Sequence, residues 1–218
     1  LDNTTGTDIF CGGQVVQPRD GRVLLIGGDR SVNNLRNYAV ADVNVFDPAV
    51  NTLTRQAQPM TYRRWYATAV TMPSGEQVVL GGRDDRDQAA TDTFLGTVGT
   101  YATTPEVFNP DTGWRVLPGA ASSVAFGLDD ENFWYPKAWL APNGKVLSIS
   151  HDGALFEVDA TGDGTVQQLP VKMLYSNANA PSVMYAPGKI MSMRHDSNVQ
   201  LLELNGETPV VSTAAPMS

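Results

Sequence analysis

An apolar run that ends in two consecutive glycines occurs twice in this chain, and it constrains the fold more than any other feature. The runs are Val23 to Gly28 and Val78 to Gly82, and their first glycines lie 54 residues apart. Self-similarity at a period of about 50 residues is typical of repeated β units. Each run follows a turn containing Pro and Gly, which joins it to an earlier apolar stretch as a β-hairpin. The sequence therefore predicts at least two copies of one β unit.

Two shorter strands should complete each unit. We expect them at residues 43–46 and 53–56 in the first unit, and at 106–108 and 114–116 in the second. Two degenerate copies keep the hairpin turn but lose the paired glycines. Their strands are expected near residues 139–147, 155–158, 166–169, 183–191, 199–204 and 209–212. About sixteen strands result, and no convincing amphipathic helix accompanies them.

Four-stranded units at this period are typical of the blades of a β-propeller. A lipocalin-like barrel or a sandwich is the weaker alternative, because neither predicts a recurring Gly-Gly ending. We therefore predict an all-β propeller segment over residues 1–218. Its blades are expected near residues 10–60, 62–120, 124–171 and 178–218. Either the ring closes at four blades or further blades are missing. An open arc would expose two blade faces, which repeat proteins normally cap or pair, and we favour a fragment or one part of a split chain.

Composition excludes two classes of partner. The formal net charge of −8 argues against a phosphate-binding surface, so nucleic acid is not an expected partner. The apolar runs are far shorter than the roughly 20 residues that a membrane helix needs, so no membrane segment is expected. The first residues lack the features of a signal peptide, so any export signal would already have been removed.

Repeat register places a thiol and a phenol at matching positions. Cys11 lies 16 residues before the first glycine of its pair, and Tyr66 lies 15 residues before the first glycine of the next. Tyr135 takes the same position in the third unit and Asn179 roughly takes it in the fourth. Because the first strand of each blade lies nearest the axis, these side chains should gather at one mouth of the channel. The alternative for Cys11, the only cysteine, is a small buried hydrophobic residue.

Two segments carry a family resemblance. Residues 8–13 (Asp-Ile-Phe-Cys-Gly-Gly) and 64–69 (Arg-Trp-Tyr-Ala-Thr-Ala) resemble the motifs that supply the cysteine-linked tyrosine of copper radical oxidases, the family of galactose oxidase and glyoxal oxidase. Residues 72–82, 105–110 and 135–144 are similar to the amino-terminal part of glyoxal oxidases, the closest pattern. The resemblance implies a kelch-type propeller, with this chain supplying about four blades of a seven-bladed ring.

The resemblance also implies a reaction. Cys11 sulfur would bond to the ring carbon beside the hydroxyl of Tyr66, and that phenolate would bind copper. Cys11 and Tyr66 would then form a thioether radical cofactor, with Tyr66 as the metal ligand. Such enzymes oxidise primary alcohols or aldehydes, carbohydrates included, with O2, and they release hydrogen peroxide. An extracellular or periplasmic location follows from the same resemblance.

The chain departs from the family pattern at the remaining copper ligands. The family completes its site with a Tyr-His pair and a further histidine near the carboxyl end, and no Tyr-His pair occurs here. His151 and His195 are either substitute ligands or solvated loop residues beside Asp. We expect the missing ligands in a complementary carboxyl-terminal propeller segment, and therefore no oxidase activity from these 218 residues alone.

Three residues are candidates for the substrate rim, namely Trp65, Arg83 and Tyr135. Arg83 stands where members similar to galactose oxidase have a tryptophan that stacks over the linked tyrosine, and Trp65 is a candidate replacement. Arg83 itself would stack, hold an anionic substrate, or form a surface salt bridge with a neighbouring Asp. The stretch 83–101 is expected to be a loop that shapes this rim.

A second class of function stays open at this point. Propellers host many functions, so the chain is alternatively a non-catalytic kelch propeller that binds carbohydrate or protein. The two hypotheses differ in the chemical state of Cys11, which is cross-linked in the first and a thiol in the second.

Overall fold

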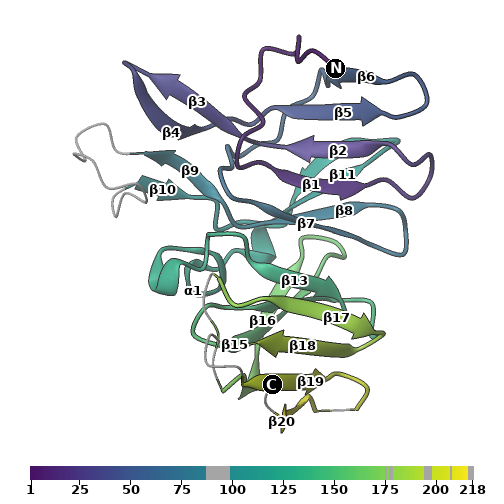
Figure 1. Cartoon of the computed structure of the whole chain (residues 1–218), viewed down its shortest axis with the longest axis vertical. Helices are drawn as coiled ribbons and strands as arrows, with labels where there is room; N and C mark the ends of the chain where they lie inside the picture. Colours follow the sequence, from purple (N-terminus) through teal and green to yellow (C-terminus); the bar gives the residue numbers. More distant parts are fainter. Residues whose placement is uncertain (87–98, 175, 177–178, 194–197, 207, 216–218) are drawn as a thin grey trace.

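The protein is built from four four-stranded antiparallel sheets that follow one another along the chain (Figure 1). The computed structural model describes residues 1–86, 99–174, 176, 179–193, 198–206 and 208–215. Blade 1 consists of β1 (Gly13–Val16), β2 (Val23–Ile26), β5 (Val43–Asp47) and β6 (Thr52–Arg55). Blade 2 consists of β7 (Thr68–Thr71), β8 (Gln77–Leu80), β11 (Glu106–Asn109) and β12 (Gly113–Val116). Blade 3 consists of β13 (Lys137–Leu140), β14 (Val146–Ile149), β15 (Ala154–Asp159) and β16 (Thr165–Lys172). Blade 4 consists of β17 (Ser182–Ala186), β18 (Lys189–Met193), β19 (Val199–Glu203) and β20 (Val210–Ala214). The four blades are arranged as a β-propeller, which confirms the predicted fold class.

Two extra hairpins project from the blades on the side that also carries helix α1 (Ser123–Phe126) (Figure 1). One pairs β3 (Asp29–Val32) with β4 (Leu35–Ala39), and the other pairs β9 (Arg83–Arg86) with β10 (Gly99–Tyr101). The prediction of a single loop over 83–101 is therefore wrong at both ends of that stretch, and residues 87–98 lie outside the described part. Within the described residues, no helix is long and apolar enough to cross a membrane.

The core lies between successive blades, where the inward faces of neighbouring sheets meet. Leu24 and Val45 of blade 1 pack with Val79 of blade 2, and comparable clusters join blades 2 and 3 and blades 3 and 4. Burying an aliphatic side chain of this size contributes about 1.5–3 kcal/mol each. This packing fixes how the blades sit against one another, and with it the positions of the residues at their ends.

The repeated glycines stand where the ends of neighbouring blades approach most closely. Gly27 has φ 68°, and a Cβ there would lie 2.1 Å from the Arg64 carbonyl oxygen. Gly81 has φ 64°, and a Cβ there would lie 2.5 Å from Pro136 Cγ. Each glycine thus combines a left-handed backbone with contact to the next segment, which explains the repeat by which the fold was predicted.

We predict that Gly27→Ala destabilises the protein by about 2–5 kcal/mol, because the added methyl group collides with backbone in a left-handed conformation. The matched control is Gly75→Ala, at φ 85° with nothing within 4 Å of the added Cβ. That variant should lose only the conformational part, about 1–2 kcal/mol. Urea unfolding of both variants measures the difference, and equal losses would contradict this account of the repeat.

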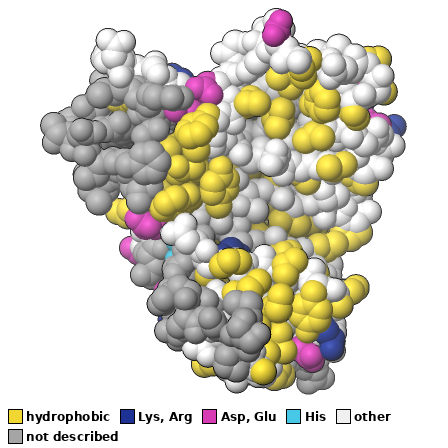
Figure 2. Space-filling view, viewed as in Figure 1, with side chains coloured by type: hydrophobic (Ala, Val, Ile, Leu, Met, Phe, Trp, Pro, Cys, Tyr) yellow, Lys and Arg dark blue, Asp and Glu magenta, His cyan; other side chains and the backbone are white. Residues whose placement is uncertain are grey.

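The outer face of blade 4 carries apolar side chains that none of the described residues covers. Aligned through their hairpin turns, Val183 and Met191 of blade 4 occupy the register positions of Trp139 and Leu147, which lie in the core between blades 3 and 4. Yet Val183 is 45% exposed, and hydrophobic side chains gather on the surface of this part of the molecule (Figure 2). The face thus carries the pattern of an interface between blades.

Candidate functional site

Three residues at equivalent blade positions share an unusual backbone conformation. Cys11, Tyr66 and Tyr135 have φ values of 58°, 71° and 42°, in the left-handed region that non-glycine residues rarely occupy. Tyr135 N–H donates to the Tyr66 carbonyl oxygen at 2.9 Å, and Tyr66 N–H donates to the Cys11 carbonyl oxygen at 2.9 Å. One chain of hydrogen bonds therefore links blades 1, 2 and 3 just before their first strands. Asn179, expected to take this position in the fourth unit, is an exposed turn residue.

The structure brings the side chains of Cys11 and Tyr66 together. The Tyr66 hydroxyl lies within hydrogen-bonding reach of the half-buried Cys11 sulfur. Cys11 also packs against the buried cluster that contains Trp65, Tyr66 and Phe133. The sulfur therefore stands near the hydroxyl end of the ring.

Two indole rings stack on the Tyr66 ring. The centroid of Trp65 lies 3.8 Å away with an interplanar angle of 29°, and that of Trp134 lies 5.2 Å away at 18°. Side chains of consecutive residues normally point to opposite faces of an extended chain. The left-handed backbone at Tyr66 instead allows Trp65 and Tyr66 to lie face to face. Only 5% of Tyr66 is exposed, so the phenol is largely shielded from water.

Burial controls the protonation of both phenols. Burial, and then the hydrogen bond with Cys11, raises the pKa of Tyr66 well above its usual range. Burial, with a smaller contribution from Cys11, raises the pKa of Tyr135 to about 12. Both phenols are therefore protonated at neutral pH unless a cation stabilises the phenolate.

Arg83 lies behind the stack. Its guanidinium stands 4.3 Å from the centroid of the Trp65 ring, a cation–π contact, and the two backbones form an antiparallel bridge. Arg83 is only 1% exposed, so the expected position at the surface is wrong. Of the three rim candidates, Trp65 and Arg83 are buried, whereas Tyr135 is 39% exposed. Their roles as substrate contacts stay predictions.

A buried ion pair anchors the segment that carries Tyr66. Arg64 donates to Glu106 Oε2 from Nη2 at 3.0 Å and to the carbonyl oxygen of Gly81 from Nη1 at 2.5 Å. Glu106 in turn accepts the backbone N–H of Thr61 at 2.6 Å. Both side chains of the pair are 0% exposed. The pair ties the segment before Tyr66 to β11 and to the end of β8.

The histidines supply no demonstrated ligand. His151 is buried, and its backbone N–H donates to Asn132 Oδ1 at 2.7 Å. This excludes the solvated-loop alternative for His151, while His195 lies outside the described residues. The described part of the chain holds no group of three His, Cys, Asp or Glu side chains able to hold a metal ion.

The donors that do converge are one sulfur and two phenol oxygens. Phenolate oxygens suit Cu(II), which favours four nitrogen and oxygen donors in a tetragonal arrangement. The described residues thus fit the phenolate half of a copper site and leave its imidazole half to other residues.

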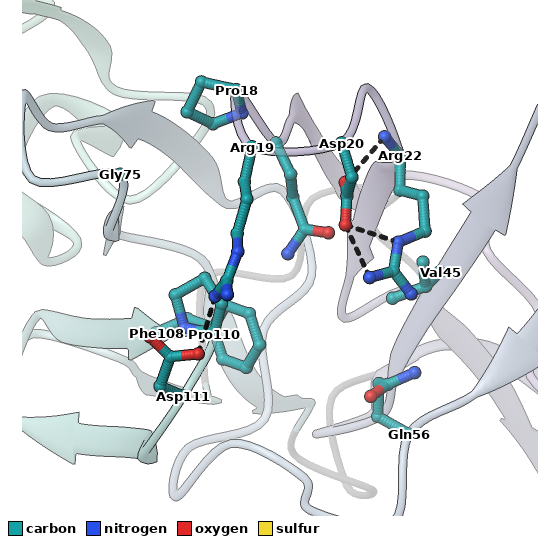
Figure 3. Close-up of a pocket in the computed structure, with 11 residues that line it drawn as sticks. Pro18, Arg19, Asp20, Arg22, Val45, Gln56, Gly75, Phe108, Pro110 and Asp111 are labelled. Carbon is teal, nitrogen blue, oxygen red and sulfur yellow. Dashed lines mark hydrogen bonds and ion pairs between the residues drawn. The ribbon is translucent and has the colours of Figure 1, made fainter.

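A separate cavity of about 390 Å³ lies at the opposite ends of the strands, by the hairpin turns of blades 1 and 2 (Figure 3). Arg19 is paired with Asp111 at 2.6 Å and Arg22 with Asp20 at 2.5 Å. Because both guanidinium groups are already paired, the cavity offers no uncompensated charge to a ligand. It is also remote from Cys11, which lies at the start of β1 whereas the turn lies at its end.

Sequence reasoning missed Trp134 and Arg64 as parts of the site. A signal for Trp134 was available, because the dipeptide Trp-Tyr occurs at both 65–66 and 134–135, in matching register. No comparable signal marks Arg64, whose partner Glu106 is 42 residues away.

Comparisons with known proteins agree with the fold. No protein-family model matches the chain. A WSC domain-containing protein of Arthroderma benhamiae is 31% identical over 169 residues, which cover 75% of this chain and 16% of that protein. A fungal alcohol oxidase of the AA5 family, solved in complex with copper, superimposes with a TM-score of 0.67 at 22% identity over 96% of this chain and 43% of its own. YjhT superimposes with a TM-score of 0.63 at 16% identity over 95% of this chain and 71% of its own.

The chain therefore shares the propeller topology of a copper alcohol oxidase. It spans less than half of that enzyme and about a sixth of the WSC domain-containing protein.

Proposed function

We propose that this chain is part of a copper radical oxidase that oxidises primary alcohols or aldehydes with O2 and releases hydrogen peroxide. The observation that carries the proposal is the contact between the Cys11 sulfur and the hydroxyl end of Tyr66, inside an aromatic cluster. The closest family pattern is that of glyoxal oxidase. The fold shared with a copper-bound AA5 alcohol oxidase supports the same reaction class.

The proposed cofactor is a thioether between Cys11 sulfur and the ring carbon beside the Tyr66 hydroxyl. Its formation breaks one S–H and one C–H bond and forms one S–C bond. Two protons and two electrons leave the protein, and O2 accepts them to give hydrogen peroxide. The sulfur substituent spreads the unpaired electron of an oxidised Tyr66 and makes that ring easier to oxidise than an ordinary tyrosine.

Two-electron oxidation of the substrate needs two electron acceptors. Copper held by the Tyr66 phenolate would supply the capacity for one of the two electrons, and an oxidised Tyr66 ring would accept the other. O2 then reoxidises the site, so that one peroxide forms for each substrate molecule. The indoles of Trp65 and Trp134 shield the oxidised ring from water and from side reactions.

Completion of the site requires residues beyond the described phenols. We propose that a complementary propeller segment packs on the apolar outer face of blade 4 and brings the missing Tyr-His pair and the further histidine. The exposed side chain of Val183 at an interface register position supports this partner. The proposal also implies an extracellular or periplasmic location.

Copper titration tests the role of Tyr66. We expect Cu(II) to produce a visible phenolate-to-copper absorption band in the 218-residue chain, and Tyr66→Phe to remove at least half of its intensity. The control is Tyr185→Phe, on β17 and 50% exposed, which should leave the band unchanged. A titration without any such band, or one in which Tyr66→Phe has no effect, would contradict the proposed function.

A further inference from the structure

We propose that the cavity between blades 1 and 2 binds a neutral, polyhydroxylated ligand of about the size of a hexose. The cavity of about 390 Å³ runs from the hairpin turn at Pro18, past Val45 of β5, to Gln56, the residue after β6 (Figure 3). Its volume lies within the range of about 300–1,000 Å³ that is usual for small-molecule sites. The inference does not rest on the proposed function, because the residues that line this cavity differ from those of the aromatic cluster around Cys11.

The charged side chains of the cavity are joined in two ion pairs. Arg19 Nη1 donates to Asp111 Oδ1 at 2.6 Å, which links the hairpin turn of blade 1 to the outer turn of blade 2. Arg22 Nε donates to Asp20 Oδ2 at 2.7 Å. The lining residues include two Arg and two Asp, so their formal charges cancel and a charged ligand would lack a counter-charge. The paired groups keep further N–H donors and carboxylate lone pairs, which hydroxyl groups can use.

Two glutamine side chains that line the cavity have amide groups without a hydrogen bond within the described part of the chain. Gln17 is only 6% exposed, and Gln56 is partly buried at the end of the cavity away from the turn (Figure 3). An amide offers a donor and an acceptor side by side, and adjacent hydroxyls of a sugar match both. Because an enclosed polar group is stabilised when it is paired, the Gln17 amide is the observation that carries the inference.

The cavity also has an apolar wall. Phe108 and Pro110 line it from blade 2, and Val45 lines it from blade 1. The Phe108 ring is held in place by Trp114, whose ring centroid lies 5.1 Å away at an interplanar angle of 43°. A sugar ring presents C–H groups on its faces and hydroxyls at its edge. It can therefore contact the apolar wall while its hydroxyls reach the amides and the ion pairs, the combination of contacts usual in small-molecule sites.

An NMR titration of the ¹⁵N-labelled chain with glucose, galactose or mannose, each added singly, tests the inference. We expect at least one of these hexoses to shift the backbone amide signals of residues 17–22 and 108–111. The dissociation constant should be on the order of 1 mM, as suits a ligand of about twelve non-hydrogen atoms. Gln17→Met, which keeps the length of the side chain but removes the amide, should raise this constant at least about tenfold. The matched control is Gln167→Met, at an exposed position of β16, which should leave it unchanged.

The outcomes separate a role in binding from a role in folding. Because Gln17→Met removes an amide that has no partner, the variant should unfold in urea at the same concentration as the unaltered chain. If it is destabilised, Gln56→Met at the other end of the cavity should show the same loss of binding. No response to any of the three hexoses would overturn the inference, because water alone would then fill the cavity. An unchanged dissociation constant in both variants, or tighter binding of glucuronate or glucosamine than of every neutral hexose, would also overturn it.

Discussion

Incubation of the chain with Cu(II) and O2 should remove two hydrogens from its mass and make Cys11 unreactive to alkylation. The physical reason is that the Cys11 sulfur lies within hydrogen-bonding reach of the Tyr66 hydroxyl, at the end of the ring that carries the carbon to which it would bond. Each molecule holds a single cysteine, so we expect both the loss of two hydrogens and the loss of alkylation at Cys11 in nearly every molecule. Denaturing mass spectrometry before and after treatment with an alkylating reagent measures both quantities.

Two variants control this experiment. Tyr66→Phe keeps the aromatic ring but removes the hydroxyl needed to form the radical, so Cys11 should stay reactive. Tyr185→Phe, on the exposed face of β17, should cross-link like the unaltered chain. A copper-treated chain of unchanged mass, with Cys11 fully alkylated, would instead support the non-catalytic kelch propeller that binds carbohydrate or protein.

The blade architecture was predictable because it repeats. The paired glycines mark the points where the ends of blades 1 and 2 meet their neighbours, and their spacing gave the register of those two inner hairpins. The retained hairpin turns gave the register of the inner hairpins in blades 3 and 4. The predicted outer strands agree with the structure to within a few residues, as for β5 (Val43–Asp47) and β6 (Thr52–Arg55). The same register placed Cys11 and Tyr66 at equivalent positions, where the structure brings their side chains into contact.

The features that sequence reasoning missed depend on contacts distant in sequence. Strands β3 (Asp29–Val32) and β9 (Arg83–Arg86) consist largely of polar residues, so no alternation of apolar residues marks them in the sequence. Backbone hydrogen bonds pair them with β4 and β10, and such bonds leave no pattern of residue types. The left-handed φ of Tyr66 could not be read from a residue type that rarely adopts it. Tyr66 combines this conformation with a ring that stacks on Trp65 and is only 5% exposed, whereas register alone would place the ring at an open channel mouth.

Arg64 is expected to contribute more to stability than any other charged residue described. Its guanidinium makes five hydrogen bonds, to Glu106 and to the carbonyl oxygens of Gly81, Ala102 and Thr104. Burial lowers the pKa of Arg64, and Glu106 opposes that shift. Removing one partner of a fully buried pair leaves an uncompensated charge and unsatisfied polar groups, at a cost of about 3–5 kcal/mol.

We therefore predict that Arg64→Met lowers the free energy of unfolding by about 3–5 kcal/mol. The control is Arg55→Met. Arg55 is half exposed in its ion pair with Asp42, so this variant should lower the free energy of unfolding by less than about 1 kcal/mol. Urea unfolding of the two variants measures the difference, and equal losses would show that the buried pair has no special role.

Arg64 also positions the next two residues, because it ties the segment before Tyr66 to the end of β8. For this reason, under conditions where Arg64→Met is still folded, its copper-dependent cross-linking should be slower than that of Arg55→Met. Equal cross-linking rates would separate the stability of the ion pair from the geometry of the site.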